Sequence, residues 1–223
     1  MSVHELIKRL PSAEELRIRS QALAVLDAIA CPDVDLRAFT FENTREKGAK
    51  AEMRDGMGGE FTIHFTQAGV FVRGFDHESP MSPYRESPPV VWPGLTEEIP
   101  AEFLPLLNQR VVAGSNSVPL ATVLFWLRAE GTAWETSGVV VPDAMTVDAD
   151  GAEILFGQFV DDQPVAYVER AEEIFEITMD AELVASIMRK VRIDRSLVDT
   201  LNPEADYQEL TEVFKRADFS YEE

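Results

Sequence analysis

The stretch Phe61-Thr-Ile-His-Phe-Thr-Gln-Ala-Gly-Val-Phe-Val72 decides the fold class, because apolar and polar residues alternate along its first half. Phe61, Ile63 and Phe65 occupy every second position, which is the period of a strand with one buried face. Ala68-Gly69 interrupts the alternation at a point where small residues are typical of a hairpin turn. The stretch therefore predicts two antiparallel strands.

Upstream of this hairpin the sequence predicts one helix and one strand. Ser12 and Glu15 have the spacing of a capping box, and apolar residues follow at helical spacing as far as Pro32. The period then changes to two between Leu36 and Phe41, which predicts a strand. The Gly56-Met-Gly-Gly59 cluster is read as a second turn.

Downstream, a proline-rich segment separates the hairpin from further strands. Residues 76–94 contain five prolines, a density that favours a long loop or a lid over helix or sheet. A short helical stretch is predicted over residues 96–107, and strand composition returns over residues 121–127. Residues 139–141, with Trp134, are expected to add one more strand.

Beyond residue 150 the pattern becomes helical. Helices are predicted over residues 154–159, 164–175, 180–191 and 197–201, and from Asp206 onward. Their expected core-facing residues include Ile154, Val165, Ile174 and Val191. Strands followed by helices predict an α+β fold, with residues 1–145 as a mixed region, 146–223 as a helical region packed on it, and both in one folding unit. The residues expected to be buried are Phe61, Ile63, Phe65, Phe125, Leu155, Phe159, Ile187 and Phe214.

The composition restricts the class of partner. The chain has 223 residues and a formal net charge of -20, and 45% of its residues are hydrophobic, which is too many for a disordered acidic tail. This charge argues against binding nucleic acid or an anionic membrane surface, both of which need basic residues. The N-terminus has no signal-peptide apolar run and no window is apolar enough to span a membrane, so a cytoplasmic protein is predicted. Cys31 is the only cysteine, and a structural role is expected for it.

The familiar cofactor motifs are missing from the sequence. Neither Gly48 nor the Gly56 cluster is followed by the Lys-Ser/Thr pair of a phosphate-binding loop. Residues 146–157 imitate part of a calcium loop, but Gly157 stands where a bidentate Glu is needed, so a turn with a helix cap is the preferred interpretation. No cofactor and no metal are predicted.

One constellation supports an enzymatic alternative. Asp76, His77 and Glu78 are consecutive, and His64 lies on the upstream strand. If the loop folded back over His64, these side chains would suit a metal-dependent or His-based hydrolase. The simpler interpretation makes His64 an outward-facing strand residue and the other three part of a plain loop, flanked by Arg73 and Arg85.

Two short segments resemble a group of bacterial proteins that carry no assigned function. They are Gly74-Phe-Asp-His-Glu78 leading to Trp92-Pro-Gly94, and Leu201-Asn-Pro-Glu-Ala-Asp206 before a terminal helix. The likeness extends over most of residues 60–220. It implies a mixed α+β domain of bacterial origin, and it brings no catalytic residue or cofactor.

The acidic residues are concentrated in the second half of the chain. Residues 1–110 carry a net charge of -5 and residues 111–223 carry -15, and between Glu130 and Glu182 fourteen acids accompany one base, Arg170. Such a cluster opposes folding through mutual repulsion, so either it is solvated surface or it serves to bind a basic partner. The helix from Pro164 is expected to present Glu169, Glu172, Glu173 and Glu176.

The leading hypothesis is a non-enzymatic protein that binds a basic protein, such as an immunity-type or antitoxin-like inhibitor of a basic toxin. The hydrolase and a scaffold subunit are the alternatives, and the oligomeric state is left open.

Overall fold

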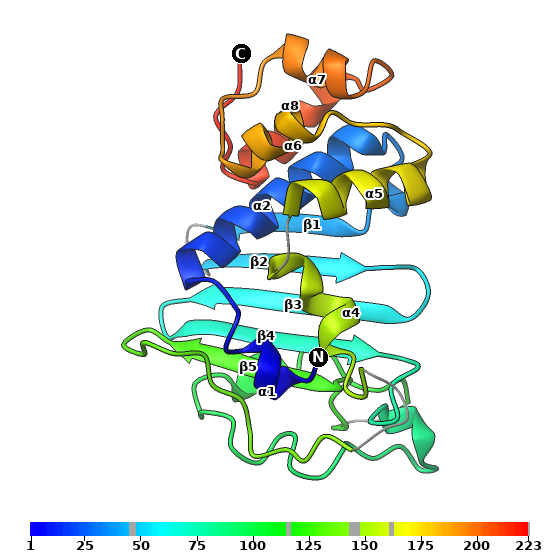
Figure 1. Cartoon of the computed structure of the whole chain (residues 1–223). Coiled ribbons are helices and arrows are strands. Elements are labelled where there is room, and N and C mark those ends of the chain that lie inside the picture. The colour runs from blue at the N-terminus through cyan, green and yellow to red at the C-terminus, as the bar shows by residue number, and fades with distance from the viewer. Residues whose placement is uncertain (45–47, 115–116, 143–147, 161–162, 223) are drawn as a thin grey trace. The chain divides into compact units, whose positions relative to one another are not determined.

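The computed structural model describes residues 1–44, 48–114, 117–142, 148–160 and 163–222. It confirms the α+β class, with five strands in one sheet in the order β1-β2-β3-β4-β5 and helices mostly in the C-terminal part (Figure 1). The chain divides into two compact units. Unit 1 comprises Met1–Leu10 and Met53–Gly157, and unit 2 comprises Pro11–Glu52 and Gln158–Glu223.

Unit 1 is built on the predicted hairpin. β3 (Gly59–Thr66) pairs antiparallel with β4 (Gly69–Asp76), and β4 pairs antiparallel with β5 (Val123–Arg128). Gln67 and Ala68 make the turn of the hairpin. Gly69 has a φ of +127°, and a side chain there would meet the carbonyl of Leu127, so a residue with a Cβ would be strained.

The two faces of this part of the sheet bury different side chains. α1 (Val3–Leu6) and α4 (Ala152–Phe156) lie over one face (Figure 1). There the Phe156 ring lies 5.1 Å from the rings of both Phe61 and Phe125. The opposite face is covered by the long β4–β5 connection, from which Phe103 stacks on Phe71 at 5.5 Å.

The second face also holds an ion cluster centred on the buried Arg73 and Glu60. The Arg73 guanidinium donates to Glu60 at 2.9 Å and to the carbonyl of Leu120 at 2.7 Å, and Arg110 donates to both oxygens of Glu60. His64 lies on this face because it is in register with Phe71. It is buried, so the expectation that His64 faces outward was wrong.

The proline-rich segment is irregular, as predicted. Residues 77–103 contain, as regular structure, only the 3-10 turn η2 (Pro83–Arg85), and α3 is limited to Leu104–Leu107. The indole of Trp92 donates to the carbonyl of Val140 at 3.1 Å, which attaches this segment to residues near 140. Residues 139–141 are not a strand, contrary to expectation, and only an isolated bridge joins Trp126 to Glu135.

Unit 2 is organised around α2 (Ala13–Ala30), a helix buried along most of its length. Ser12 caps it by accepting from the backbone N–H of Glu15, but the Glu15 carboxylate binds Arg19 at 2.7 Å and does not complete the capping box. β1 (Phe39–Thr44), α6 (Ala181–Met188), α7 (Arg195–Leu201) and α8 (Tyr207–Arg216) all pack on α2. α5 (Gln163–Phe175) packs on α6.

The remaining elements include one that the sequence did not reveal. β2 (Gly48–Arg54) was not predicted, because its buried positions are Ala49, Ala51 and Met53, which are weak strand formers. η1 (Val34–Leu36) is a 3-10 turn where the strand was expected to begin, and η3 (Gly157–Phe159) extends α4.

The predicted core is confirmed, with a few exceptions. All eight residues expected to be buried have less than a tenth of their surface exposed. The exceptions are apolar residues assigned to the inner faces of helices: Ile154, Val165, Ile174 and Val191 are exposed. In the described part of the chain, no helix combines the length and the hydropathy needed to cross a membrane.

Candidate functional site

The candidate site is a surface groove in unit 2, which we call the helix-end groove. Its volume is about 650 Å³, and it is lined by residues 30–33 and 36, 174–177 and 202–204. These three segments follow or include the C-terminal ends of α2, α5 and α7. In Figure 1 these three ends lie on the right of this unit.

Prolines and a left-handed residue explain why the three helices end here. Pro32 and Pro203 follow α2 and α7 within two residues of each helix, and proline is common just beyond a helix because it cannot continue it. α5 ends where Glu176 adopts a φ of +56°. The groove is therefore bordered by segments that leave their helices in new directions.

Large apolar side chains are exposed at the groove. Leu36 is 66% exposed and Ile174 is 48% exposed, and Val34, on the same turn as Leu36, is 69% exposed. Singly exposed apolar residues are ordinary on protein surfaces, but several around one concavity are typical of a binding site. This site was not predicted, because the sequence pattern placed Leu36 in a strand and Ile174 in the core.

The charges of the groove lining are all negative. Asp33, Glu176 and Glu204 are exposed and line the groove, and none of the lining residues is basic. The C-terminal ends of helices add partial negative charge, since each helix dipole leaves about half an elementary charge at that end. The groove therefore combines apolar side chains with a field that attracts cations.

Arg37 shows that the end of α2 binds a cation. Its guanidinium donates to the carbonyls of Cys31 at 2.8 Å and Pro32 at 3.0 Å. The side-chain amide of Asn202 donates to the carbonyl of Ile29 at 2.7 Å. Asn202 thus satisfies a carbonyl in the last turn of α2, and Arg37 satisfies those of the two residues that follow the helix.

Cys31 lies in the wall of the groove but does not have the properties of a nucleophile. Its thiol is buried and donates to the carbonyl of Asp33. Burial raises the pKa of this thiol, so it stays protonated at neutral pH.

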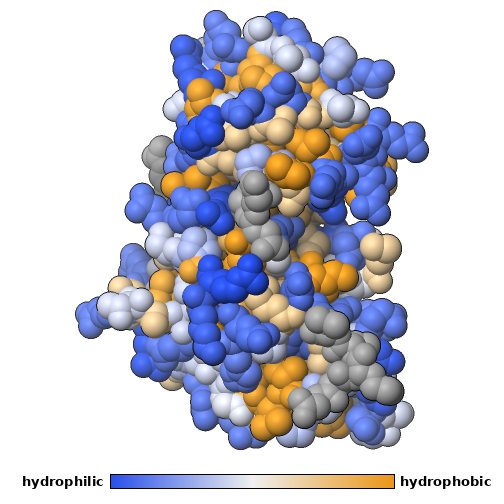
Figure 2. Space-filling view, viewed as in Figure 1, coloured by the Kyte–Doolittle hydropathy of each residue, from blue (hydrophilic) through white to orange (hydrophobic). Residues whose placement is uncertain are grey.

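An exposed row of carboxylates lies next to the groove along α5. Glu169, Glu172, Glu173 and Glu176 are all exposed, and we call them the acidic ridge. Glu169, Glu172 and Glu173 are three and four residues apart and so share one side of α5, and Glu176 is the first residue after the helix. Hydrophilic side chains gather over this end of α5, beside hydrophobic ones (Figure 2). Glu176 belongs to both the acidic ridge and the groove lining.

The one base of this acidic stretch, Arg170, lies toward the interior. Its guanidinium carbon lies 5.1 Å from the centre of the Phe39 ring, and its Nε is buried. In the same part of unit 2, Asp27 accepts hydrogen bonds from the backbone N–H groups of Ala38 and Phe39 and from the hydroxyl of Tyr167. The positive charge of Arg170 therefore favours the ionised form of Asp27. The side chain of this only basic residue of α5 does not lie among the carboxylates of the acidic ridge.

Burial is the main cause of the pKa shifts of Asp27 and Tyr167. Desolvation raises the pKa of Asp27, although its hydrogen bonds and Arg170 act in the opposite direction. Desolvation, followed by the charge of Asp27, raises the pKa of Tyr167 well above its ordinary value. Because these groups are enclosed by α2, β1 and α5, they stabilise the packing that positions the acidic ridge.

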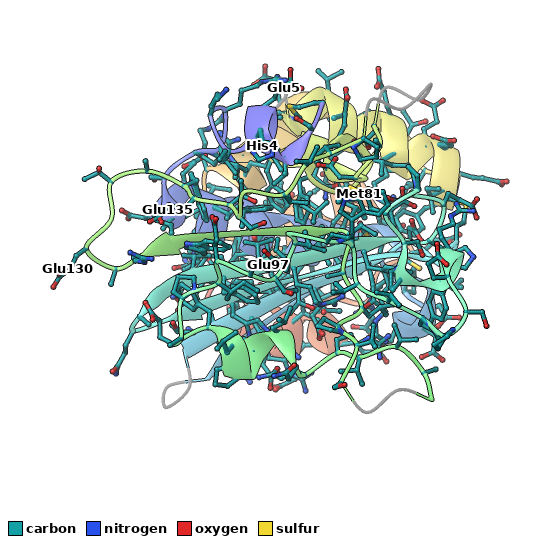
Figure 3. All side chains as sticks on the ribbon, turned by 90° about the horizontal axis from the view of Figure 1, so that it is seen from below. His4, Glu5, Met81, Glu97, Glu130 and Glu135 are labelled. Carbon is teal, nitrogen blue, oxygen red and sulfur yellow. The ribbon has the colours of Figure 1, made fainter. Side chains whose placement is uncertain are left out.

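The other acids of the Glu130–Glu182 stretch have varied roles. Asp150 is fully buried and accepts from the backbone N–H of Val3 at 2.7 Å. Asp148 accepts from the backbone N–H groups of Glu153 and Ile154 in the first turn of α4, which confirms the expected helix cap. Figure 3 shows Glu130 projecting from the loop after β5 and Glu135 beside that strand. Asp143, Asp161 and Asp162 lie outside the described residues.

The structure does not bring the four residues of the hydrolase hypothesis together. Asp76 is in register with Gly59, five positions along β3 from His64, which at about 3.4 Å per residue places them roughly 17 Å apart. His77 and Glu78 are exposed, with His77 Nε2 4.0 Å from the Glu78 carboxylate. Arg85 also lies 4.0 Å from Glu78, whereas Arg73 binds Glu60 instead.

Asp76 stabilises the turn that follows β4. It accepts from the backbone N–H of Glu78 at 3.0 Å, and burial, followed by the nearby charges of Asp148 and Glu78, raises its pKa. Within the residues that the structure describes, no group of three or more His, Cys, Asp or Glu side chains is arranged to hold a metal ion.

Comparisons with known proteins add no family to this description. No protein-family model matches the chain, and searches of curated proteins and of solved structures found no match. The helix-end groove and the acidic ridge are therefore the features of this protein that bear on its function.

Proposed function

We propose that this protein acts without catalysis, by binding a basic protein through the acidic ridge. The observation that carries the proposal is that the acidic side chains at α5 are exposed to solvent, whereas its basic side chain lies toward the interior. Glu169, Glu172, Glu173 and Glu176 are exposed, while Arg170 lies over Phe39. A surface needed only for solubility would gain from interspersed bases, which reduce self-repulsion.

An immunity-type or antitoxin-like inhibitor of a basic toxin is the most concrete form of this function, and we place it in the cytoplasm. Complementary charge accelerates encounter and disfavours acidic competitors, which suits an inhibitor that must capture its target quickly. The same charge repels phosphate, so we expect no affinity for DNA or RNA.

The test compares two variants with equal changes in net charge. In the ridge variant, Glu169, Glu172, Glu173 and Glu176 are replaced by Gln. In the control, four exposed acids elsewhere in unit 2 are neutralised: Glu14→Gln, Asp199→Asn, Glu209→Gln and Glu212→Gln. The partner is first isolated by affinity purification from the host and identified by mass spectrometry, and association rates are then measured at several salt concentrations.

We expect the ridge variant to associate with the partner about ten-fold more slowly at low salt, and the control to remain close to wild type. The difference should disappear near 1 M salt, where the screening length is only about 3 Å. Equal on-rates and equal salt dependence for the two variants would show that the acidic ridge is ordinary solvated surface.

A further inference from the structure

We propose that the helix-end groove receives an amphipathic helical segment of the basic partner. The apolar side of that segment covers Leu36 and Ile174, and its Lys and Arg side chains reach Asp33, Glu176 and Glu204. This inference rests on the proposed function, because it names the part of the partner that binds beside the acidic ridge.

The exposed apolar residues of the groove call for an apolar ligand surface. Leu36 and Ile174 come from different elements, η1 and the last turn of α5, yet line the same concavity. At 66% and 48% exposure, they retain apolar surface that a partner could remove from water. An amphipathic helix binds grooves of this kind through apolar anchors spaced three, four and seven residues apart.

The charge of the groove selects a basic segment over a neutral or acidic one. Three exposed carboxylates line it, no lining residue is basic, and it lies at the C-terminal ends of three helices, where the helix dipole leaves partial negative charge. Arg37 already occupies the carbonyls of Cys31 and Pro32, just beyond α2, so the cations of the ligand are left the three carboxylates. Charge complementarity therefore identifies lysine and arginine as the flanking residues of the ligand.

The groove and the acidic ridge form one continuous surface through Glu176. This residue lines the groove and also ends the row that begins at Glu169. A partner that approaches along the ridge thus meets the groove at the end of α5. The ridge would accelerate encounter, and the groove would determine how long the complex lasts.

The experiment uses two fluorescent 18-residue peptides of identical composition and the full-length protein. One peptide places Leu at positions i, i+3, i+4 and i+7 with Lys on the opposite side, and the other is a scrambled sequence without that period. Peptide affinity is measured by anisotropy for wild type, for the groove variant Leu36→Glu/Ile174→Glu, and for Val191→Glu. Val191 is an exposed apolar residue of unit 2 outside the groove lining, so it serves as a matched control.

The groove variant adds two negative charges, so apolar docking and simple charge attraction predict opposite results. We expect the amphipathic peptide to bind wild type at least ten-fold more tightly than the scrambled peptide, and the groove variant to lose at least ten-fold in affinity. Val191→Glu should bind as well as wild type or slightly better. Circular dichroism of each variant checks that the fold is kept.

Equal binding of the two peptides, or tighter binding to the groove variant, would overturn the groove inference. If the ridge variant still slowed association with the natural partner, the proposed function would stand without the groove. If neither the ridge variant nor the groove variant changed any binding, both proposals would fail. Binding of the amphipathic peptide that is lost only in the groove variant supports both the groove and its occupant.

Discussion

Asp27 is a buried carboxylate whose partners are all hydrogen-bond donors. One oxygen accepts from the backbone N–H groups of Ala38 at 2.8 Å and Phe39 at 2.9 Å, and the other accepts from the hydroxyl of Tyr167 at 2.9 Å. This arrangement joins α2, β1 and α5 at one point. The burial of this acid was not predicted from the sequence.

We expect Asp27→Asn to be tolerated and Asp27→Leu to destabilise the protein. The Asn carbonyl can keep both backbone bonds, and its NH₂ can donate to Tyr167, whose hydroxyl also accepts. Leu leaves two buried N–H groups unsatisfied, at a cost of about 2–5 kcal/mol in the free energy of unfolding. Urea denaturation of the two variants measures the difference, and a Leu variant as stable as the Asn variant would contradict it.

The same pair of proteins tests the direction of the Asp27 pKa shift. Because burial raises the pKa of Asp27 in the folded protein above the ordinary 3.8, the native state binds more protons than the unfolded state in that window. Its contribution to stability is therefore largest at low pH and decreases as pH rises from about 3.8 through the folded pKa. Wild type should lose stability relative to Asp27→Asn over this range, and an opposite slope would show that the pKa is lowered.

At the scale of elements, α6 and α8 end with the same backbone device. Lys190 and Asp218 both have a φ of +56°, and the N–H groups of Val191 and Phe219 bond back to the carbonyls of Ser186 and Phe214. These are Schellman ends, where glycine is the usual residue because a Cβ costs energy in the left-handed region. The sequence does not reveal that α6 and α8 end in this way, since neither left-handed position is Gly or Asn.

We expect Asp218→Gly to stabilise the protein by about 0.5–1 kcal/mol, since relief of the left-handed strain exceeds the added entropy of the unfolded chain. Lys190→Gly is the matched control. Its ammonium donates to Gln21 Oε1 at 3.2 Å and to the carbonyl of Asp218 at 2.7 Å, so its removal offsets the gain. Thermal denaturation should rank Asp218→Gly above wild type and Lys190→Gly below Asp218→Gly. The reverse ranking would contradict this account.

At the scale of the whole molecule, each compact unit is assembled from two separated segments of chain. Unit 1 needs residues near 156 to complete a core that begins near 61, since Phe156 packs against Phe61 and Phe125. Unit 2 needs α2 for α6, α7 and α8 to pack on. The predicted boundary between residues 145 and 146 would therefore remove part of each unit.

We expect the fragments 1–145 and 146–223 not to fold when expressed separately. The first lacks α4 and so exposes one face of its strands, and the second lacks the helix at the centre of its packing. A two-dimensional NMR spectrum of each fragment, with the intact chain as control, measures this directly. Well-dispersed peaks from either fragment alone would show that the boundary separates independent domains.

The sequence by itself determined the elements whose apolar period is regular. The alternation from Phe61 to Phe65 predicted β3 and one of its two buried faces, and the Ser12 cap with the apolar residues before Pro32 predicted α2. It also indicated the acidic ridge, because Glu169, Glu172 and Glu173 are three and four positions apart and therefore share one side of the predicted helix. These are local properties, and a few neighbouring residues are enough to determine them.

The tertiary structure decided which apolar and ionisable residues are buried. Nothing local to Ile174, Leu36, His64 or Asp27 distinguishes a core position from a surface one, because that depends on what other segments cover them. The helix-end groove is likewise formed by three segments, the first of which lies more than a hundred residues before the other two. Only packing brings the ends of α2, α5 and α7 together, and so only the folded chain reveals where an apolar, negatively charged surface is left for a partner.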